Sequence, residues 1–404
     1  MTSADYLILG AGVAGTTAAE TIRGRDAGGS IMLVGDEPHP LYSRVLMPHF
    51  VRGRVPEAGL FLKKPAWYAE KTIEYASGVA ALKIDSEAKR VILSDGREVG
   101  YGKLLIATGG KPRRLDCPGA AEAGVLQLQT VDDARVLAAA NAGPALVIGG
   151  GFIAMEFALS FAHKGIATTV ATRGGGFWAR LMGDASRTMI AEALARHGVA
   201  LRVGSELESL AREHGRVRAR FKDGANIDCA VVGAGIGIDP NVGFLKGSGI
   251  AVNLGVVTDE YLAASAPDVY AAGDVAEFFD LSAGGRHVLG NWANALFHGK
   301  TVGATMAGEK TAYSSLTSYS INCFELPIAF LGTVDPDDER IERRHDDAVI
   351  QCFLRDGRAV GATAVGKFHE REAVNALISK KVVFGAGDRS SFADAKVPLA
   401  NFVP

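Results

Sequence analysis

A glycine-rich turn between an apolar strand and a helix occurs twice in this 404-residue chain. In the first copy, residues 6–9 predict a strand and residues 13–22 predict an amphipathic helix. A second strand is predicted at 31–34. The turn after the first strand contains the GxGxxG glycines Gly10, Gly12 and Gly15. This order predicts a βαβ unit, because parallel strands need a crossover that a helix commonly supplies.

The second copy begins 139 residues later, counted from Gly10 to Gly149, with a predicted strand at 145–148. A helix to about residue 163 and a strand at 168–171 follow. The matching turn positions hold Gly149, Gly151 and Ala154. One architectural unit is therefore built twice.

Both copies continue in the same way. An alternating hairpin contains an Asp-Gly pair, at 95–96 and at 223–224, which favours a two-residue primed turn. A buried strand that ends on glycine follows at 104–110 and at 230–237. The repeat predicts an α/β fold with two Rossmann-like dinucleotide-binding domains, each a three-layer unit of parallel sheet plus antiparallel hairpin.

The C-terminal region has a different pattern. Residues 318–332 are strand-like, a hairpin is predicted around 356–357 and a helix near 370–381. This order predicts a small α+β domain. The mixed charges of 335–347 favour a solvated connector, with a docking patch as the alternative. We expect three domains. The first is made of residues 1–113 and 245–315, the second of residues 114–244 and the third of residues 316–404.

Composition limits the partners and the compartment. The net charge of −2 indicates no general attraction to nucleic acid. The four cysteines, at 117, 229, 323 and 352, have neither metal-site nor CxxC spacing, and we expect no metal. They favour a reducing compartment. The sequence predicts no signal peptide and no membrane span, so we expect a cytoplasmic protein.

The glycine turns predict where phosphates bind. In GxGxxG, backbone and helix N-terminal amides approach a pyrophosphate. Asp36 lies 24 residues after Gly12, within reach of a ribose hydroxyl. The second copy has Thr172 and Arg173 where an acid would stand, so Arg173, helped by Arg180, is a candidate for a 2′-phosphate; ordinary surface solvation is the alternative. Two such sites favour a flavin and a nicotinamide.

Six motifs in this order resemble the flavoprotein reductases of the pyridine nucleotide-disulfide oxidoreductase fold. They are GAGVAG at 10–15, GDEPHPLYSR at 35–44, LLIATGG at 104–110, GGGFIAME at 149–156, YAAGDV at 270–275 and NWANALFHG at 291–299. The resemblance implies FAD on the first unit and NAD(P)H on the second. It also implies that the C-terminal domain is an interface domain.

The resemblance assigns candidate binding residues motif by motif. For FAD they are Gly10, Gly12, Ala14, Gly15, Asp36, Glu37, Arg44, Ala107, Thr108, Gly109, Arg113, Gly273, Asp274, Trp292 and Ala295. For NAD(P)H they are Gly149, Gly151, Phe152, Ile153, Thr172, Arg173, Arg180 and Gly235. With Thr172 and Arg173 in place of the acid, we expect NADPH to be used at least as well as NADH.

Two candidates for the chemistry come from the same resemblance. Glu156 stands where similar proteins place a carboxylate beside the nicotinamide and flavin; a paired helix-end acid is the alternative. His49 replaces a lysine that lies near the flavin in relatives, and an ordinary loop histidine is its alternative. His298 also departs from the family, because glutamine is common at that position.

The branches of this family differ in their redox cysteines, so the cysteine positions indicate which branch the chain resembles. Disulfide reductases of this fold carry CxxxxC, CxxC or a single redox cysteine, and the position of that single cysteine holds Val45 here. No thiol relay is therefore expected. What remains resembles rubredoxin and ferredoxin reductases, proteins like apoptosis-inducing factor, and the flavin portion of assimilatory nitrite reductases.

This branch implies an FAD-dependent enzyme that takes a hydride from NAD(P)H and passes electrons to a partner. The partner would be a small iron–sulfur or rubredoxin-type protein or a partner subunit, and the chain itself a monomer or homodimer. Two alternatives stay open. The flavin could instead reduce a quinone or dioxygen directly, or the chain could be a redox-sensing flavoprotein without turnover.

Overall fold

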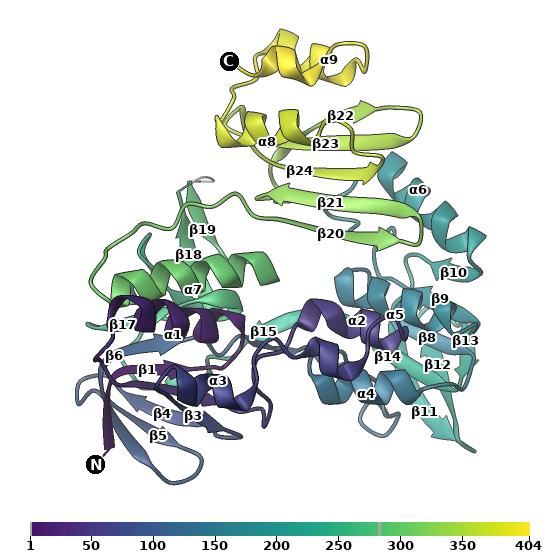
Figure 1. The fold of residues 1–404 in the computed structure, drawn as a ribbon. Coiled ribbons are helices and arrows are strands. Elements are labelled where there is room, and N and C mark those ends of the chain that lie inside the picture. Colours follow the sequence, from purple (N-terminus) through teal and green to yellow (C-terminus); the bar gives the residue numbers. More distant parts are fainter. Residues whose placement is uncertain (1, 282–283) are drawn as a thin grey trace. The chain divides into compact units, whose positions relative to one another are not determined.

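The structure, a computed structural model, describes residues 2–281 and 284–404 (Figure 1). Contacts divide the chain into two compact units, each assembled from three segments. Unit 1 consists of Met1–Leu46, Val55–Lys111 and Ile238–Ser315. Unit 2 consists of Met47–Arg54, Pro112–Gly237 and Leu316–Pro404. The division into three domains at the bounds given above stays a prediction.

Unit 1 is built on a sheet whose parallel part has the order β3-β2-β1-β6, with β17 also paired to β6. The antiparallel hairpin β4–β5 joins this sheet through β5, which pairs with the N-terminal part of β6. The strands are β1 (Thr2–Leu9), β2 (Ile31–Gly35), β3 (Ile73–Ser77), β4 (Ala81–Asp85), β5 (Arg90–Leu93), β6 (Glu98–Ile106) and β17 (Val269–Ala271). The order reverses at β1, which pairs with β2 on one side and β6 on the other, and such a switch point is where nucleotides bind.

Two helices of unit 1 lie side by side against this sheet, α1 (Val13–Arg25) and α7 (Trp292–Met306) (Figure 1). They can approach closely because Gly299 has no side chain: a Cβ there would lie 2.5 Å from the Ala14 carbonyl oxygen. The remaining elements of the unit are α3 (Pro65–Glu70), η1 (Arg44–Leu46), η2 (Glu57–Leu60), η3 (Gly243–Leu245), η4 (Gly273–Val275), β7 (Gly110–Pro112), β15 (Ile238–Pro240), β16 (Val256–Val257), β18 (Ala276–Asp280) and β19 (Gly285–His287).

Unit 2 repeats the parallel arrangement with the order β10-β9-β8-β14. Its strand β8 is buried, as are the last three residues of β14, and the helix α5 packs on both strands. A three-stranded antiparallel sheet, β11-β12-β13, belongs to the same unit. The elements are α2 (Met47–Val51), α4 (Val131–Ala139), β8 (Ala145–Ile148), α5 (Phe152–His163), β9 (Thr168–Ala171), α6 (Asp184–Arg196), β10 (Val199–Arg202), β11 (Leu207–Glu213), β12 (Arg216–Phe221), β13 (Asn226–Cys229) and β14 (Val231–Ala234).

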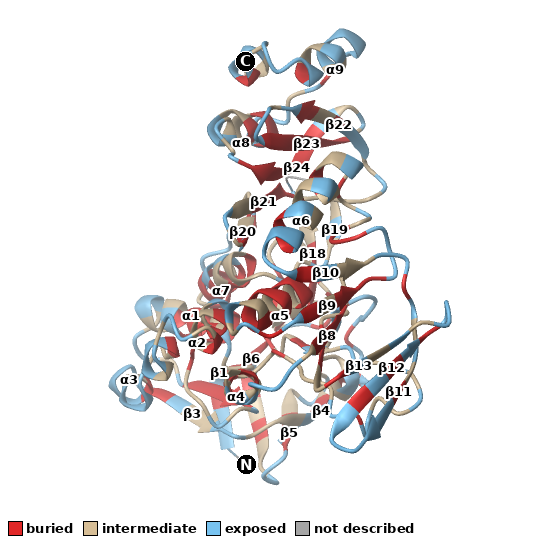
Figure 2. Ribbon diagram, turned by 90° about the vertical axis from the view of Figure 1, so that its right-hand side faces the viewer, coloured by how far each residue is buried: buried red, intermediate tan, exposed pale blue. Residues whose placement is uncertain are grey.

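The C-terminal part of unit 2 is a five-stranded antiparallel sheet in the order β20-β21-β24-β23-β22. Its central strands are almost fully buried (Figure 2). The elements are β20 (Ser318–Cys323), β21 (Leu326–Gly332), β22 (Glu339–Arg344), β23 (Ala348–Arg355), β24 (Arg358–Gly366), α8 (Arg371–Ser379), α9 (Ala386–Ala393) and η5 (Leu399–Phe402). The predicted fold class, two α/β dinucleotide-binding folds followed by an α+β region, is confirmed.

Two local predictions were wrong. The segment 335–347 is not a solvated connector, because 339–344 form strand β22 paired with β23. Its Arg343 is 1% exposed, donates to four backbone carbonyls and pairs with Glu370 at 3.0 Å, so the charged group is partnered inside the fold. The turns at 95–96 and 223–224 are also not two-residue primed turns. Their aspartates keep negative φ, and only Gly96 (φ 87°) and Gly224 (φ 85°) are left-handed, as in a three-residue loop with a glycine bulge.

Candidate functional site

The first glycine turn lies where the sheet order of unit 1 reverses. Gly10 has φ 111° and its amide donates to the Val34 carbonyl oxygen at 2.7 Å. A Cβ at Gly10 would lie 2.1 Å from the carbonyl oxygen of Ala107, the residue that follows β6. The turn therefore needs glycine both for its conformation and for its contact with the neighbouring strand.

Gly12 has a different surrounding. It is the N-cap of α1 and is exposed, and among the described residues no heavy atom lies within 4 Å of a Cβ built on it. It also has no side chain, so no side chain of the N-cap residue caps the first amides of α1. Uncapped helix N-termini attract phosphate. Gly15 is needed for packing instead, since its Cβ would lie 1.9 Å from the Gly10 oxygen.

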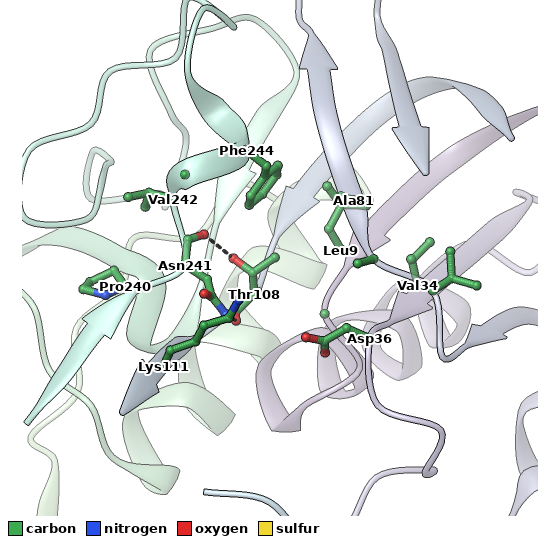
Figure 3. A pocket seen from close by; sticks show the side chains of 14 residues that line it. Leu9, Val34, Asp36, Ala81, Thr108, Lys111, Pro240, Asn241, Val242 and Phe244 are labelled. Carbon is green, nitrogen blue, oxygen red and sulfur yellow. Dashed lines mark hydrogen bonds between the residues drawn. The ribbon is translucent and has the colours of Figure 1, made fainter. Parts of the chain in front are cut away.

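A cavity of about 300 Å³ opens beside this turn, within unit 1 (Figure 3). The exposed carboxylate of Asp36 lies on one side of it. On the other side, the Thr108 hydroxyl donates to the Asn241 carbonyl oxygen at 3.0 Å, and the Asn241 amide donates back to Thr108 at 3.1 Å. The sequence reasoning missed several lining residues, which carry no motif: Val79, Ala80, Lys111, Asn241 and Phe244.

Glu37 and Arg44, both candidates for FAD, contact each other. The Glu37 carboxylate accepts from Arg44 at 2.6 Å and from the Tyr42 hydroxyl at 2.5 Å. Burial raises the pKa of the Asp274 carboxyl to about 6, and the Arg44 guanidinium opposes that shift. Glu37 therefore holds Arg44 in place through an ion pair, and the Arg44 charge acts on Asp274.

Three further FAD candidates, Gly273, Trp292 and Ala295, lie in the turn η4 and at the start of α7. Gly273 (φ 77°) lies close to α1 and α7, because its Cβ would be 3.1 Å from the Ala14 Cβ and 3.6 Å from the Ala295 Cβ. Trp292 is the first residue of α7 and is half-buried. Gly109 follows Thr108 with φ 61°. Arg113 belongs to unit 2, where its amide donates to the Gly237 carbonyl oxygen at 2.9 Å.

The second glycine turn reproduces the first one in unit 2. Gly149 has φ 129°, its amide donates to the Ala171 carbonyl oxygen at 3.0 Å, and its Cβ would lie 2.2 Å from the Gly235 carbonyl oxygen. Gly151 is the N-cap of α5, and again no described heavy atom lies within 4 Å of its Cβ position. The two turns therefore share both the close approach and the open helix N-terminus.

The end of β9 holds the residues expected to select the nucleotide. Thr172 is 3% exposed, and its hydroxyl donates to the Gly174 carbonyl oxygen at 3.0 Å, so the hydroxyl is already occupied. Arg173 and Arg180 are exposed. Arg187 reaches the same loop, because a Cβ on Gly175 would lie 2.6 Å from its guanidinium. The loop after β9 therefore carries two exposed arginines, and Arg187 of α6 lies beside it.

Phe152, a nucleotide candidate at the start of α5, lies in an aromatic cluster. Its ring centroid lies 4.9 Å from that of Trp178, 5.0 Å from that of Tyr319 and 5.1 Å from that of Phe330. Tyr319 and Phe330 come from β20 and β21, so the C-terminal sheet packs against the first turn of the nucleotide helix. The next residue, Ile153, is half-buried.

Glu156 is held by a residue that the sequence reasoning did not find. The Arg52 Nη1 donates to the Glu156 carboxylate at 2.6 Å, and the side chains are 6% and 18% exposed. His49, the other catalytic candidate, lies in α2, three residues before Arg52. Burial, and then the Arg52 charge, lower the pKa of His49. No local sequence pattern links Arg52 to Glu156, because the two residues are 104 positions apart in the chain.

The surroundings of all four cysteines favour the protonated thiol. Cys229, Cys323 and Cys352 are buried, which raises their pKa values to about 11, 12 and 12. Burial also raises the pKa of Cys117, which is half-buried. Val45, at the position of the family's redox cysteine, is 56% exposed. Among these positions, no cysteine has the lowered pKa that a thiolate electron relay requires.

Comparison with known proteins agrees with this geometry. A family model described as pyridine nucleotide-disulphide oxidoreductase matches residues 4–299, and the chain belongs to that family. The sequence is 29% identical to a rhodocoxin reductase of Rhodococcus erythropolis over 387 residues, which is 94% of this chain and 90% of the relative. It is 30% identical to the ferredoxin reductase subunit of a 5,5′-dehydrodivanillate O-demethylase of Sphingobium sp. over 406 residues, 98% and 97% of the two chains.

Among solved structures, the ferredoxin reductase of a Rhodopseudomonas palustris system superimposes with a TM-score of 0.89 at 25% identity, with all of both chains covered. The family assignment makes the chain an FAD-dependent oxidoreductase that uses a pyridine nucleotide. The residues of unit 1 fit FAD: the space at Gly12, the open α1 N-terminus and the cavity beside Asp36 lie together at the sheet's switch point.

No membrane-crossing helix is found: within the described part of the chain, no helix has the required length and apolar character.

Proposed function

We propose that the chain is an NAD(P)H-dependent FAD reductase that delivers electrons to a small iron–sulfur or rubredoxin-type protein or to a partner subunit. The observation that carries the proposal is the near full-length similarity to a rhodocoxin reductase and a ferredoxin reductase subunit, combined with cysteines that stay protonated. Without a thiolate, electrons must leave the protein from the cofactor itself.

FAD, when bound, accepts the electron pair of the nicotinamide and releases electrons to the acceptor. The protein's residues bind and orient. The first amides of α1 receive the pyrophosphate, and Asp36 accepts from a ribose hydroxyl. Arg44 and Asp274 complete the site in unit 1, together with the backbone at 107–109 and the start of α7. The candidate residues given above stay our proposal for this site.

In unit 2, the N-terminus of α5 receives the phosphates of the nicotinamide nucleotide. Glu156 is our candidate for the carboxylate beside the nicotinamide, and Arg52 orients it through the 2.6 Å ion pair. The lowered pKa of His49 favours a neutral imidazole at neutral pH. His49 therefore supplies a hydrogen-bonding group there, and Arg52 supplies the fixed positive charge.

We further propose that NADPH is used at least as well as NADH. The acid that would accept from a ribose 2′-hydroxyl is missing, the loop after β9 carries Arg173 and Arg180 instead, and Arg187 of α6 reaches that loop. Steady-state kinetics with both nucleotides test this. We expect Thr172→Glu to shift preference toward NADH and Arg173→Ala to raise KM for NADPH alone; a strong NADH preference of the wild type would contradict the proposal.

The free cysteines support our proposal of a reducing compartment, the cytoplasm.

A stopped-flow experiment tests the electron-transfer function. The FAD-loaded protein is mixed anaerobically with NADPH or NADH, and the visible flavin absorbance is followed. It is then mixed with air, with a quinone, with rubredoxin or with a [2Fe–2S] ferredoxin. We expect fast bleaching, slow reoxidation by air and quinone, and fast reoxidation by one of the redox proteins. Faster reoxidation by quinone or air would favour the small-acceptor alternative, and a long-lived bleached state with every acceptor would favour a redox sensor.

A further inference from the structure

His298 lies fully buried in α7 and contacts the turn that carries Asp274. Its relative exposure is 0%, and its Nδ1 accepts a hydrogen bond from the Gly273 amide at 3.2 Å. An imidazole nitrogen that accepts carries no proton, so the proton of the neutral ring is on Nε2. The hydrogen bond thus fixes one tautomer.

The other side of the ring is apolar. Nε2 is buried and has no hydrogen-bond partner among residues 2–281 and 284–404. The ring is perpendicular to two aromatic rings, that of Phe278 at 4.5 Å (82°) and that of Tyr313 at 4.4 Å (89°). The Tyr313 hydroxyl is occupied, since it donates to Asn294 in the same helix at 2.8 Å. The surroundings therefore hold a neutral imidazole in one orientation.

The partner of this hydrogen bond is a backbone group that needs an acceptor. Gly273 is buried with φ 77°, and the Cβ atoms of Ala14 and Ala295 lie near it on α1 and α7. Without His298, its amide would be a buried donor left unpaired, and such groups are rare and costly. The hydrogen bond fixes the peptide that leads directly into Asp274.

We propose that His298 is a positioning residue for the cofactor: its imidazole acceptor holds the Gly273–Asp274 turn in the shape that receives FAD. This inference rests on the proposed function, because it takes Asp274 as part of the FAD site. It assigns to His298 no contact with the cofactor, and it predicts that the acceptor at this position, rather than the ring, is what FAD binding requires.

Three variants of the full chain test the inference. His298→Gln keeps an acceptor, and His298→Leu removes it. Val302→Ala, a fully buried position on the same helix, controls for a cavity in α7. Apoprotein is titrated with FAD by quenching of flavin fluorescence, and visible circular dichroism of the bound flavin reports the shape of its site. Thermal unfolding of each apoprotein measures stability separately.

We expect His298→Leu to raise the Kd for FAD by roughly five- to tenfold, the worth of one buried hydrogen bond, and to alter the circular dichroism. His298→Gln should bind FAD as the wild type does. Val302→Ala should lower the unfolding temperature without changing the Kd. Unchanged FAD binding by the leucine variant, or glutamine binding as weakly as leucine, would overturn the inference.

A nitrogen NMR spectrum of wild-type holoprotein gives a second readout that needs no variant. It should show His298 with a protonated Nε2 and an unprotonated, hydrogen-bonded Nδ1, and the opposite tautomer would overturn the inference even if His298→Leu failed to fold. The two proposals also fail differently. A wild-type chain that binds no FAD removes the proposed function and this inference together, whereas tight FAD binding that ignores residue 298 removes the inference alone.

Discussion

The guanidinium of Arg52, the residue that follows α2, donates to the Glu156 carboxylate of α5 across a distance of 2.6 Å, and the arginine side chain is only 6% exposed. The two residues are 104 positions apart in the chain. Arginine stays charged at every working pH, and buried partners of this kind depend on each other.

Removing either partner should impair the nicotinamide half-reaction. We expect Glu156→Gln and Arg52→Met to lower the rate of flavin reduction by NADPH by roughly ten- to hundredfold, because the carboxylate is lost or no longer oriented. Glu156→Gln should also cost about 3–5 kcal/mol of unfolding free energy, since it leaves a buried charge unpaired. Stopped-flow and chemical unfolding measure these. The exposed Arg54→Met is the matched control, and an equal loss there would refute the assignment.

A substitution at Gly12 should affect cofactor binding without affecting the stability of the fold. Because space is open around its Cβ position, Gly12→Ala should leave the thermal unfolding of the apoprotein within about 0.5 kcal/mol of wild type. The same methyl group should obstruct the pyrophosphate, so the FAD content of the purified variant should fall sharply. Gly15→Ala is the contrast, because its Cβ would overlap the Gly10 carbonyl and the fold itself should suffer. A Gly12→Ala protein that still fills with FAD would place the cofactor elsewhere.

Asp274 should make the apoprotein sensitive to rising pH. Its pKa is about 6 in the fold against 3.8 when unperturbed, so the folded state favours the neutral acid. Its contribution to stability is present below 3.8 and is lost as pH rises through 6. Over that pH range we expect the unfolding free energy of the Asp274→Asn apoprotein to rise relative to that of the wild type, by on the order of 1 kcal/mol per pH unit. Urea unfolding at several pH values measures this, with the exposed Asp36→Asn as control; a pH-independent difference would argue against the raised pKa of Asp274.

His298 should have the opposite pH dependence. Burial lowers its pKa from 6.5 to about 3, so the unfolded chain binds a proton that the folded chain rejects. Stability should therefore fall as pH decreases below 6.5. His298→Gln removes this loss of stability, so the variant should become more stable relative to the wild type as the pH decreases. Calorimetry of both proteins between pH 7 and pH 5 tests the sign, and a gain on the alkaline side would contradict the burial.

Arg343 should anchor the C-terminal segment. It donates to the carbonyl oxygens of Phe392, Asp394, Ala395 and Val397, at 2.7 to 3.1 Å, and pairs with Glu370 at 3.0 Å. We expect Arg343→Met to destabilise the chain by about 3–5 kcal/mol, because four carbonyl acceptors lose their donor and the Glu370 carboxylate loses its charged partner. Its neighbour Arg344 is 67% exposed at the side chain, and Arg344→Met should change little. Limited proteolysis after residue 380 should accelerate only in the Arg343 variant.

The sequence by itself determined the two glycine turns, the strands and helices beside them, and the absence of a redox cysteine at Val45. These are local properties. A run of apolar residues and a glycine at fixed spacing specify a strand, a turn and a helix start through backbone sterics that act over a few residues. The positions of Gly12 and Gly151 at open helix N-termini follow from such rules, and both turns have the geometry that the repeat predicts.

Only the tertiary structure decided which distant groups meet. Arg52 contacts Glu156, His298 accepts from Gly273, and Asn241 closes one side of the cavity onto Thr108. The charged run 335–347 shows the same limit, because composition alone favours solvent for it, yet pairing with β23 and four carbonyl acceptors place Arg343 inside. Charge and hydrogen bonding depend on partners that the chain supplies from far away, and no local pattern encodes them.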